Sequence, residues 1–356
     1  MNLEFVRRVD AFVRFAVETG KKIIICPFGD MGMKTKEVLN ERYGIMEAAI
    51  LDNYLAKENS AIKSVAQLPE LDLNGAVVLL NALNFEVSDL LESQIKACPG
   101  EYEVIKLDSY LAVGREEWLT ELKSLLKVKA VVDKSFVRIG REHDGGYIMV
   151  DDFSTNQRAY SFGICDDVSW DKDMAERGIH CYMYDHTIAG LPEENAYFHY
   201  FKRGIAGEDK PEEAVFSMET LLKSNGDEEN HNLILKMDVE GAEWDFLEMT
   251  STEVLAQFAQ MTFEWHGMYD VTNCKRVKAV IEKVNKTHQV VWMHGNNYGS
   301  LVVAGKNCMC GELELTFVRK SDYDFKSIRY DIPTPMDMAN NPHKPDYVLG
   351  NWGEND

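Results

Sequence analysis

The segment Leu233–Glu243, LILKMDVEGAE, constrains this chain more than any other stretch. A mostly apolar run predicts a buried β-strand, and the carboxylates of Asp238, Glu240 and Glu243 follow it at once around Gly241. Acidic side chains crowded at a strand end are costly unless they meet a cation, a substrate or solvent. Capping of a following helix by Asp238 or Glu240 is the alternative, because a helix N-terminus favours carboxylates.

Strand and helix patterns alternate along the chain, which predicts an α/β fold with two Rossmann-like domains. At 356 residues the chain is longer than most single cores, so two domains are expected. A β-α-β order within residues 20–110 predicts a small parallel sheet. We therefore place an N-terminal Rossmann-like domain with a leading helix at residues 1–125, a second domain at 126–325, and a C-terminal arm at 326–356 that lies over the domain or frays.

The formal net charge of −21 limits the partners of this chain. It would repel nucleic acid and an anionic membrane, although a small phosphorylated substrate in a local basic pocket stays open. Apolar positions at helical spacing in residues 1–22 predict an amphipathic helix and not a signal peptide. No stretch approaches the roughly 18 apolar residues of a membrane span, and seven cysteines, an odd number, suit reduced thiols. We expect a cytoplasmic protein and leave homo-oligomer formation open.

A second strand end stands at Ser161–Asp167, where Gly163 follows a predicted strand and precedes a predicted helix. A glycine in such a turn lets the backbone approach a ligand at the carboxyl end of the sheet. Asp185 follows Gly163 by 22 positions and ends the next predicted strand. That spacing suits a carboxylate that accepts hydrogen bonds from two ribose hydroxyls. A tight turn with a solvated aspartate is the alternative.

Asp238–Leu247, DVEGAEWDFL, resembles the signature of the FkbM-type S-adenosylmethionine-dependent methyltransferases, and the resemblance extends over about residues 130–320. It implies a class I methyltransferase sheet with an antiparallel edge, for which the β-rich runs at residues 299–305 and 312–319 are candidates. It also implies that S-adenosylmethionine lies across the strand ends. The residues then expected at the cofactor are Arg138, Gly146, Gly163, Asp166, Asp185, His186, Ile205 and Asp238.

Two further strand ends supply groups for catalysis, at Glu264 with His266 and at His294. One hypothesis is that Asp238, Glu264 or His266, and His294 hold a divalent metal, Mg²⁺ or Mn²⁺, that lowers the pKa of an acceptor hydroxyl. The other is that His266 or His294 acts as general base with Asp238 at the reacting centre, because imidazole titrates near neutral pH. A structural role for both histidines is the third alternative.

The polar segment Val137–Tyr147 precedes the second sheet. It predicts a β-hairpin with Asp144-Gly145 in the turn. Its functional alternative is a loop in which Arg138 or Arg141 meets the methionine carboxylate of the cofactor or an anionic substrate. In the N-terminal domain, Phe28–Gly32 would suit a nucleotide or nucleotide-linked sugar, and a degenerate domain for substrate presentation or dimerisation is the alternative.

Together these patterns predict a cytoplasmic O-methyltransferase that uses S-adenosylmethionine on a small polar acceptor. The expected acceptor, by family analogy, is a sugar or activated sugar precursor of a surface polysaccharide, as in capsule polysaccharide biosynthesis. The main alternative is a non-catalytic protein that binds a nucleotide sugar or acts as a scaffold. A nucleotide-sugar oxidoreductase that uses the N-terminal domain is a third.

Overall fold

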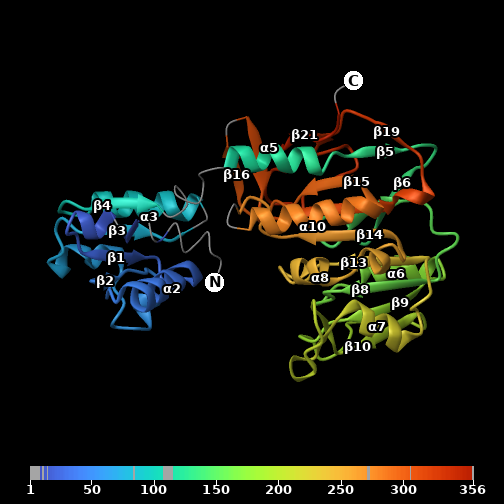
Figure 1. Ribbon diagram of the computed structural model, residues 1–356, viewed down its shortest axis with the longest axis horizontal. Coiled ribbons are helices and arrows are strands. Elements are labelled where there is room, and N and C mark those ends of the chain that lie inside the picture. The colour runs from blue at the N-terminus through green and yellow to red at the C-terminus, as the bar shows by residue number, and fades with distance from the viewer. Residues whose placement is uncertain are drawn as a thin grey trace. The chain divides into compact units, whose positions relative to one another are not determined.

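The computed structural model describes residues 9, 12–13, 15–82, 85–106, 115–270, 273–304 and 306–354. The chain forms two compact units, labelled by element in Figure 1. The first comprises Met1–Glu116 and Asp270–Asn273, and the second comprises Glu117–Tyr269 and Cys274–Asp356. The boundary thus falls near the start of α5 (Arg115–Leu125), whereas the sequence placed it at the end of that helix.

The first unit contains a four-stranded parallel sheet in the order β2-β1-β3-β4. Helix α2 (Asp30–Glu37) follows β1 and α3 (Phe85–Ala97) follows β3, so the predicted parallel sheet is present. Of the predicted leading helix, residues 9, 12, 13 and 15–18 are helical, and residues 1–8 lie outside the described part. The strands are β1 (Ile23–Cys26), β2 (Ala49–Ile50), β3 (Val77–Leu80) and β4 (Glu103–Lys106).

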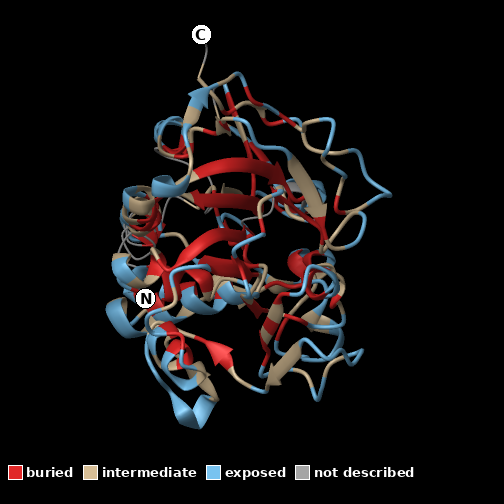
Figure 2. Cartoon of the chain, turned by 90° about the vertical axis from the view of Figure 1, so that its right-hand side faces the viewer, coloured by how far each residue is buried: buried red, intermediate tan, exposed pale blue. Residues whose placement is uncertain are grey.

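The second unit is built on a seven-stranded mixed sheet in the order β10-β9-β8-β13-β14-β18-β15. Strand β18 pairs antiparallel with both β14 and β15, and the remaining neighbours pair parallel. Figure 2 shows most of these strands buried in the centre of the unit, and the edge strand β10 is half-buried. Their bounds are β8 (Arg158–Phe162), β9 (His180–Tyr184), β10 (Phe198–Phe201), β13 (Leu233–Met237), β14 (Phe258–Trp265), β15 (His288–Gly295) and β18 (Leu313–Arg319).

The sheet ends in an antiparallel pair as predicted, formed by β18 and the edge strand β15, but the antiparallel strand β18 itself lies one position inside the edge. The two late runs also do not pair with each other. The first forms a separate hairpin of β16 (Leu301–Ala304) and β17 (Asn307–Cys310), with alternate residues exposed. Strand β18 is almost wholly buried, which explains why it takes an interior position with a neighbour on each side.

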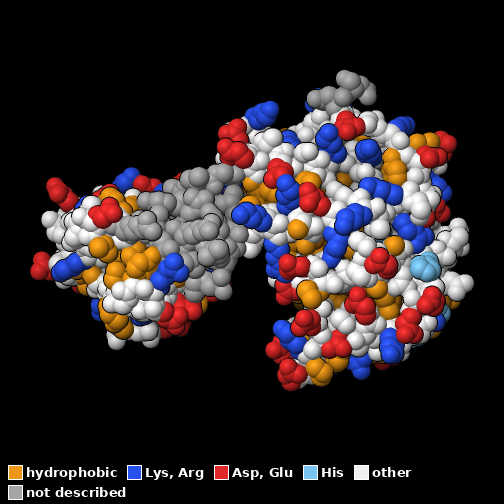
Figure 3. All heavy atoms as spheres, viewed as in Figure 1, with side chains coloured by type: hydrophobic (Ala, Val, Ile, Leu, Met, Phe, Trp, Pro, Cys, Tyr) orange, Lys and Arg blue, Asp and Glu red, His pale blue; other side chains and the backbone are white. Residues whose placement is uncertain are grey.

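Helices and a small sheet surround this central sheet. Antiparallel pairing of β6 (Phe136–Ile139) and β7 (Tyr147–Val150) confirms the predicted hairpin. The helices of the unit, besides α5, are α6 (Ser169–Glu176), α7 (Met218–Asn225), α8 (Glu243–Met249), α9 (Thr252–Leu255) and α10 (Cys274–Thr287). Over α5 and α10, basic and acidic side chains interleave in Figure 3, as in the ion pair of Lys278 with Glu121. Among the described residues no helix is long and apolar enough to cross a membrane.

Over its described residues, 326–354, the C-terminal arm packs on the second unit. Strand β19 (Phe325–Ser327) pairs with β5 (Lys129–Val131), and β20 (Asp331–Ile332) pairs with β21 (Gly350–Asn351). Between β20 and β21 the chain is held by side chains at the end of β15. Trp292 Nε1 donates to Asp337 Oδ1 at 2.9 Å, and the Asn297 amide donates to three backbone carbonyls of the arm.

Candidate active site

Asp238 stands at the carboxyl end of β13, in the middle of the large sheet. Its backbone N–H donates to Phe162 O at 3.1 Å, which continues the pairing with β8 beyond the strand. Gly163 has a φ of +75°, and a Cβ there would lie 1.6 Å from Asp238 O. Only glycine can occupy this position, because the left-handed backbone and the neighbouring carbonyl both exclude a side chain. The sequence predicts that the backbone approaches a ligand here, and the group that lies against Gly163 in the structure is the Asp238 backbone.

A pocket of about 400 Å³ opens at this end of β13 and β14. Its wall is strongly acidic, and no Lys or Arg side chain of the described residues lines it. Asn296, Tyr298 and Gly299 complete it from the loop after β15. The ionisable groups of the wall are Asp144, Asp238, Glu240, Glu264, Glu312 and His266.

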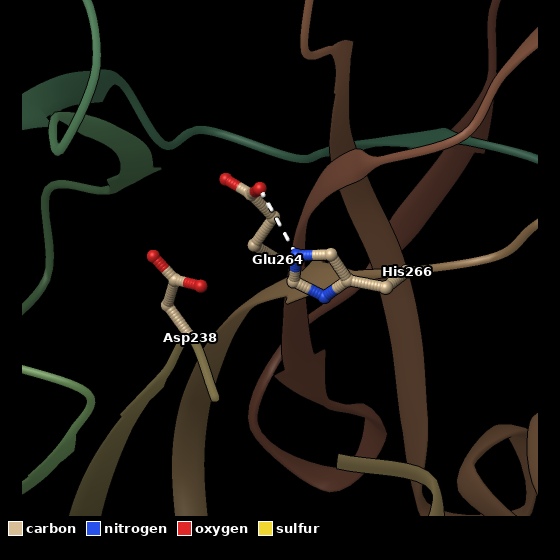
Figure 4. Close-up of side chains that lie close together, drawn as sticks. All are labelled: Asp238, Glu264 and His266. Carbon is tan, nitrogen blue, oxygen red and sulfur yellow. Dashed lines mark ion pairs between the residues drawn. The ribbon is translucent and has the colours of Figure 1, made fainter. Parts of the chain in front are cut away.

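Asp238, Glu264 and His266 face a common space in this pocket, as Figure 4 shows. One potential ligand atom from each lies within 4.8 Å of the others. Glu264 is buried at the end of β14 and accepts two 3.1 Å hydrogen bonds from Asn296 Nδ2. His266 Nε2 lies 3.4 Å from Glu264 Oε1. The carboxyl ends of two parallel neighbours thus bring together three of the groups that the sequence singles out.

Glu243, in the first turn of α8, fixes the orientation of His266. Its side chain is fully buried, and its Oε1 accepts from His266 N at 2.9 Å and lies 3.0 Å from His266 Nδ1. Its Oε2 accepts from Gly241 N at 2.7 Å. The imidazole therefore carries its Nδ1 proton toward Glu243 and turns Nε2 into the pocket. The helix-capping alternative for Asp238 and Glu240 is wrong, because the N-cap of α8 is Ala242 and has no side-chain cap bond.

Burial and neighbouring charges change the pKa values of this cluster. Desolvation raises the pKa of Asp238 above its ordinary value, and it raises the pKa of Glu264 to about 7. Burial opposes the charged form of His266, but the carboxylates of Glu243 and Glu264 outweigh it and raise its pKa to about 11. His266 is therefore an imidazolium at neutral pH in this ligand-free site, and it has no lone pair to accept a substrate proton.

His294 does not join the cluster, although the sequence places it in the metal set and among the general bases. It lies within β15 and is buried. Its Nδ1 lies 2.9 Å from Glu314 Oε2 on β18, and its Nε2 lies 3.1 Å from Asp346 Oδ1 and Oδ2 on the arm. These carboxylates raise its pKa to about 10 in spite of burial. The set that the structure assembles is therefore Asp238, Glu264 and His266, with His266 in place of His294.

Asp185 ends β9 as expected, but its carboxylate already holds the Gly163 turn. Oδ2 accepts from Ile164 N and Cys165 N at 3.0 Å each, and Oδ1 accepts from the backbone and hydroxyl of Thr187 at 2.8 and 2.6 Å. Burial opposes ionisation, yet these hydrogen bonds lower the pKa of Asp185 below its usual value. A ribose hydroxyl would have to displace one of four donors, and the Thr187 hydroxyl is the one most easily turned away.

Four other predicted cofactor residues are Asp166, His186, Ile205 and Arg138, and the structure places each of them in a loop or a short strand near the carboxyl end of the sheet or in the β6–β7 hairpin. Asp166 and His186 are exposed, and Ile205 is buried in the two-residue strand β11 (Gly204–Ile205), which pairs with β12 (Val215–Phe216). Arg138 Nη1 donates to Gly146 O at 2.7 Å, across its own hairpin, and Nη2 donates to Met336 O at 3.3 Å on the arm. The guanidinium of Arg138 therefore ties backbone to backbone and does not line the pocket.

In the predicted nucleotide site of the first unit, as at Asp185, a carboxylate accepts hydrogen bonds from the backbone of nearby turns. Asp52, after β2, accepts from Phe28 N at 3.0 Å and from Tyr54 N and Leu55 N at 2.9 Å each. Its carboxylate thus links the turn after β2 to the Phe28–Gly32 turn, where a nucleotide was expected. A Cβ added at Gly29 would meet no atom within 4 Å, so the turn itself stays open.

Two pocket carboxylates were missed as functional groups. Asp144 was interpreted only as a turn residue of the β6–β7 hairpin. Glu312 precedes β18, and it reaches this edge because an antiparallel strand begins where its parallel neighbours end. The sequence predicts that the strand after Glu312 is antiparallel. Had that strand been placed inside the sheet, its start, and so Glu312, would have been expected at this edge.

Comparison with known proteins gives one structural similarity to report. No family model matches the sequence, and no curated protein matches it. The chain is similar to the crystal structure of methyltransferase FkbM from Methylobacillus flagellatus KT, with 11% identity, a TM-score of 0.43, and coverage of 88% of this chain and 99% of that chain. At this level the similarity does not establish membership, so the family resemblance of Asp238–Leu247 stays a prediction.

Proposed function

We propose that this chain is an S-adenosylmethionine-dependent methyltransferase that methylates a hydroxyl group of a small polar acceptor. The mixed seven-stranded sheet is consistent with a methyltransferase fold. The observation that carries the proposal is the Asp238 carboxylate, whose Oδ1 is buried beside the pocket and has no hydrogen-bond partner among the described residues. A buried carboxylate oxygen without a donor is costly unless a ligand completes it.

The acidic wall fits the charge of the proposed cofactor. When bound, S-adenosylmethionine supplies an electrophilic methyl group on a positively charged sulfur. Carboxylates at the pocket would attract that cation and its ammonium group, and Asp238 Oδ1 offers the free acceptor. Gly163 would lie beside the methionine portion, and the Thr187 hydroxyl would yield its place on Asp185 to the ribose.

The reaction needs an aligned oxygen and a group that takes one proton. The acceptor oxygen forms a bond to the methyl carbon as the carbon–sulfur bond breaks, and the electron pair of that bond stays on sulfur. The hydroxyl proton goes to Asp238, because burial raises the pKa of this carboxyl and makes it a stronger base, while the neighbouring carboxylates favour the protonated form of His266. The walls of the pocket hold the acceptor in line.

A sugar is the acceptor class that the pocket supports best. Carboxylates and the Asn296 amide of the wall can bind several hydroxyl groups. An activated precursor, as expected for surface polysaccharide synthesis, would have to keep its phosphates outside the pocket, since no described Lys or Arg lines it. Arg141 Nε, the other candidate for an anion, donates to Asp144 O at 2.6 Å.

Calorimetric titration with S-adenosylhomocysteine tests this function without knowledge of the acceptor. We expect saturable binding with a Kd between about 1 µM and 1 mM, the usual range for enzyme substrates. Asp238→Asn should weaken binding, and Glu253→Gln, at an exposed acid on α9, should not. Absence of binding at millimolar ligand would reject the proposal. Release of S-adenosylhomocysteine from the cofactor in the presence of neutral, amino and nucleotide-linked sugars then identifies the acceptor class.

A non-catalytic nucleotide-sugar binding or scaffold protein is the second candidate. It is favoured by one observation, the full occupation of Asp185 by donors of its own turn. This candidate requires that the chain bind a nucleotide sugar while S-adenosylmethionine is not turned over with any acceptor. Tight binding of a nucleotide sugar together with no detectable S-adenosylhomocysteine release would favour it over the methyltransferase.

A further inference from the structure

We propose that Asp238, Glu264 and His266 bind one divalent cation of the Mn²⁺ class, and that Glu243 positions His266 for it. The inference deepens the proposed function and rests on it for the use of the cation, but the site itself can be tested alone. It revises the metal set expected from the sequence, because His294 is replaced by His266 and a positioning residue, Glu243, is added.

The donor set is the one that such a cation prefers. Two carboxylates and one imidazole offer ligand atoms that lie within 4.8 Å of one another and face a common space (Figure 4). Oxygen donors suit Mg²⁺ and Mn²⁺, and the imidazole shifts the preference from Mg²⁺ toward Mn²⁺. The open pocket beside the three side chains leaves room for water and for substrate oxygens in the remaining coordination positions.

The second, independent observation is an atom that lacks a partner. Asp238 Oδ1 is buried and accepts no hydrogen bond from the described residues. The neighbouring group of Asp144, Glu264 and Glu314 differs in this respect, since Asn340 Nδ2 donates to both Asp144 and Glu314. The Asn340 amide thus already satisfies two carboxylates of that second group, so we place the cation between Glu264 and Asp238.

The imidazole is held from behind, as expected of a metal ligand. Glu243 binds Nδ1 at 3.0 Å, and the Trp244 indole donates to His266 O at 2.9 Å, so the ring has one orientation. Its Nε2 faces Glu264 at 3.4 Å and Glu240 at 3.5 Å, distances too long for strong hydrogen bonds. Metal-binding histidines commonly donate their other ring N–H to a carboxylate in this way, which fixes the tautomer and orients the free nitrogen.

The cation would also balance the charge of the pocket. The wall carries five carboxylates and one imidazole, and no described Lys or Arg side chain. Lys236, a buried ammonium on β13, donates to Gly163 O at 2.6 Å and its charge acts on Asp238, but its side chain does not line the pocket. When bound, a divalent cation orients acceptor oxygens and lowers the pKa of a hydroxyl that approaches it.

Titration of the chelator-treated full chain with Mn²⁺, followed by the electron paramagnetic resonance signal of free Mn²⁺, tests the site. We expect one saturable equivalent, and a ¹⁴N coupling in the electron spin-echo spectrum of the bound ion that reports the imidazole. Asp238→Asn and His266→Gln should abolish saturable binding, and His266→Gln should remove the ¹⁴N coupling. Glu243→Gln should weaken binding by about 10–100-fold, the usual effect of losing such an orienting carboxylate.

Asp346→Asn is the matched control, because Asp346 holds His294 as Glu243 holds His266. It should leave Mn²⁺ binding unchanged. Circular dichroism of each variant separates loss of the site from loss of the fold, and Glu243→Gln and His266→Gln keep the proposal testable should Asp238→Asn not fold. No saturable Mn²⁺, or binding that survives both Asp238→Asn and His266→Gln, overturns the proposal.

The two proposals fail in different ways. Binding of S-adenosylhomocysteine in excess chelator together with no Mn²⁺ binding removes the metal site and leaves the methyltransferase. Binding of Mn²⁺ together with no S-adenosylhomocysteine binding removes the methyltransferase and leaves a metal site that serves another reaction.

Discussion

His266 and His294 lie at the same end of the large sheet, and each is placed between carboxylates, yet their surroundings differ. The His266 side chain is 17% exposed and faces a pocket, and its partners Glu243, Glu264 and Glu240 leave Nε2 without a strong hydrogen bond. The His294 side chain is 2% exposed, and both of its nitrogens are bound, by Glu314 and by Asp346 of the arm.

The difference shows that the surroundings of a histidine, and not its place after a strand, decide what it can do. At His294 the arm supplies the last carboxylate and closes the site, so the pair holds the arm to the sheet. At His266 no segment of the described chain covers Nε2, so that nitrogen is available to a ligand. We therefore assign stability to the His294 centre and binding to the His266 centre.

The largest expected effect that tests this assignment is on the free energy of unfolding. His294→Ala should lower the free energy of unfolding by about 3–5 kcal/mol, because it leaves Glu314 and Asp346 without the cation that they share. Urea unfolding measures the loss. His266→Ala should cost less, since Glu243 keeps two backbone N–H donors and water can enter the pocket. Equal losses in the two variants would contradict the comparison.

The pH dependence of stability should carry the same distinction. Folding raises the pKa of His294 from about 6.5 to about 10, so its contribution is complete below pH 6.5 and is lost as the pH rises toward 10. The groups that face it are Glu314 on β18 and Asp346 and Asp337 on the arm. Over that range the wild type should lose about 4 kcal/mol more than His294→Gln. Parallel pH profiles in urea unfolding would show that His294 does not hold the arm by charge.

At the His266 centre the expected effect is on chemistry. His266→Gln should lower methyl transfer to the best acceptor by about 100-fold, the lower range for a group that orients or activates a reacting oxygen. The rate of S-adenosylhomocysteine release measures it, with and without added Mn²⁺. His294→Gln, assayed at a temperature where it is folded, should stay within a few-fold of wild type. A reversed order of the two variants would exchange the roles of the two histidines.

Part of this site was accessible from the sequence because parallel strands share an edge. Asp238 and Glu264 follow neighbouring parallel strands, so their spatial proximity follows from the strand pattern. Glu312 was missed although the antiparallel direction of its strand was expected, since the place of that strand inside the sheet is set by tertiary pairing. The two histidines could not be told apart, because the partner that closes the His294 site stands 52 residues later, in a segment without periodicity.

The fold shows the same limit. The alternation of strands and helices predicts the parallel part of the large sheet, where each crossover fixes the direction of the next strand. The two late runs, β16 and β18, look alike in sequence, but only β18 is buried along its length and enters the sheet. Only the run that fits between β14 and β15 can bury both of its faces. The local sequence pattern of a run does not say which run that is.

The smallest expected effect separates charge from hydrogen bonding at the arm. Asp346→Asn keeps a side-chain oxygen that can accept from His294 Nε2 and from Tyr347 N, but it removes the negative charge. Because a hydrogen bond to a charged group contributes more than a neutral one, the free energy of unfolding should fall by about 1–2 kcal/mol. The chain has other attachments for the arm, among them the Asn297 amide and Tyr347 OH on Gly299 O, so the fold should persist.

Urea unfolding and Mn²⁺ titration of the same Asp346→Asn sample measure its free energy of unfolding and its Mn²⁺ affinity. A loss of stability with unchanged Mn²⁺ affinity places Asp346 in the His294 centre alone, and a parallel loss of both would mean that the arm also shapes the pocket.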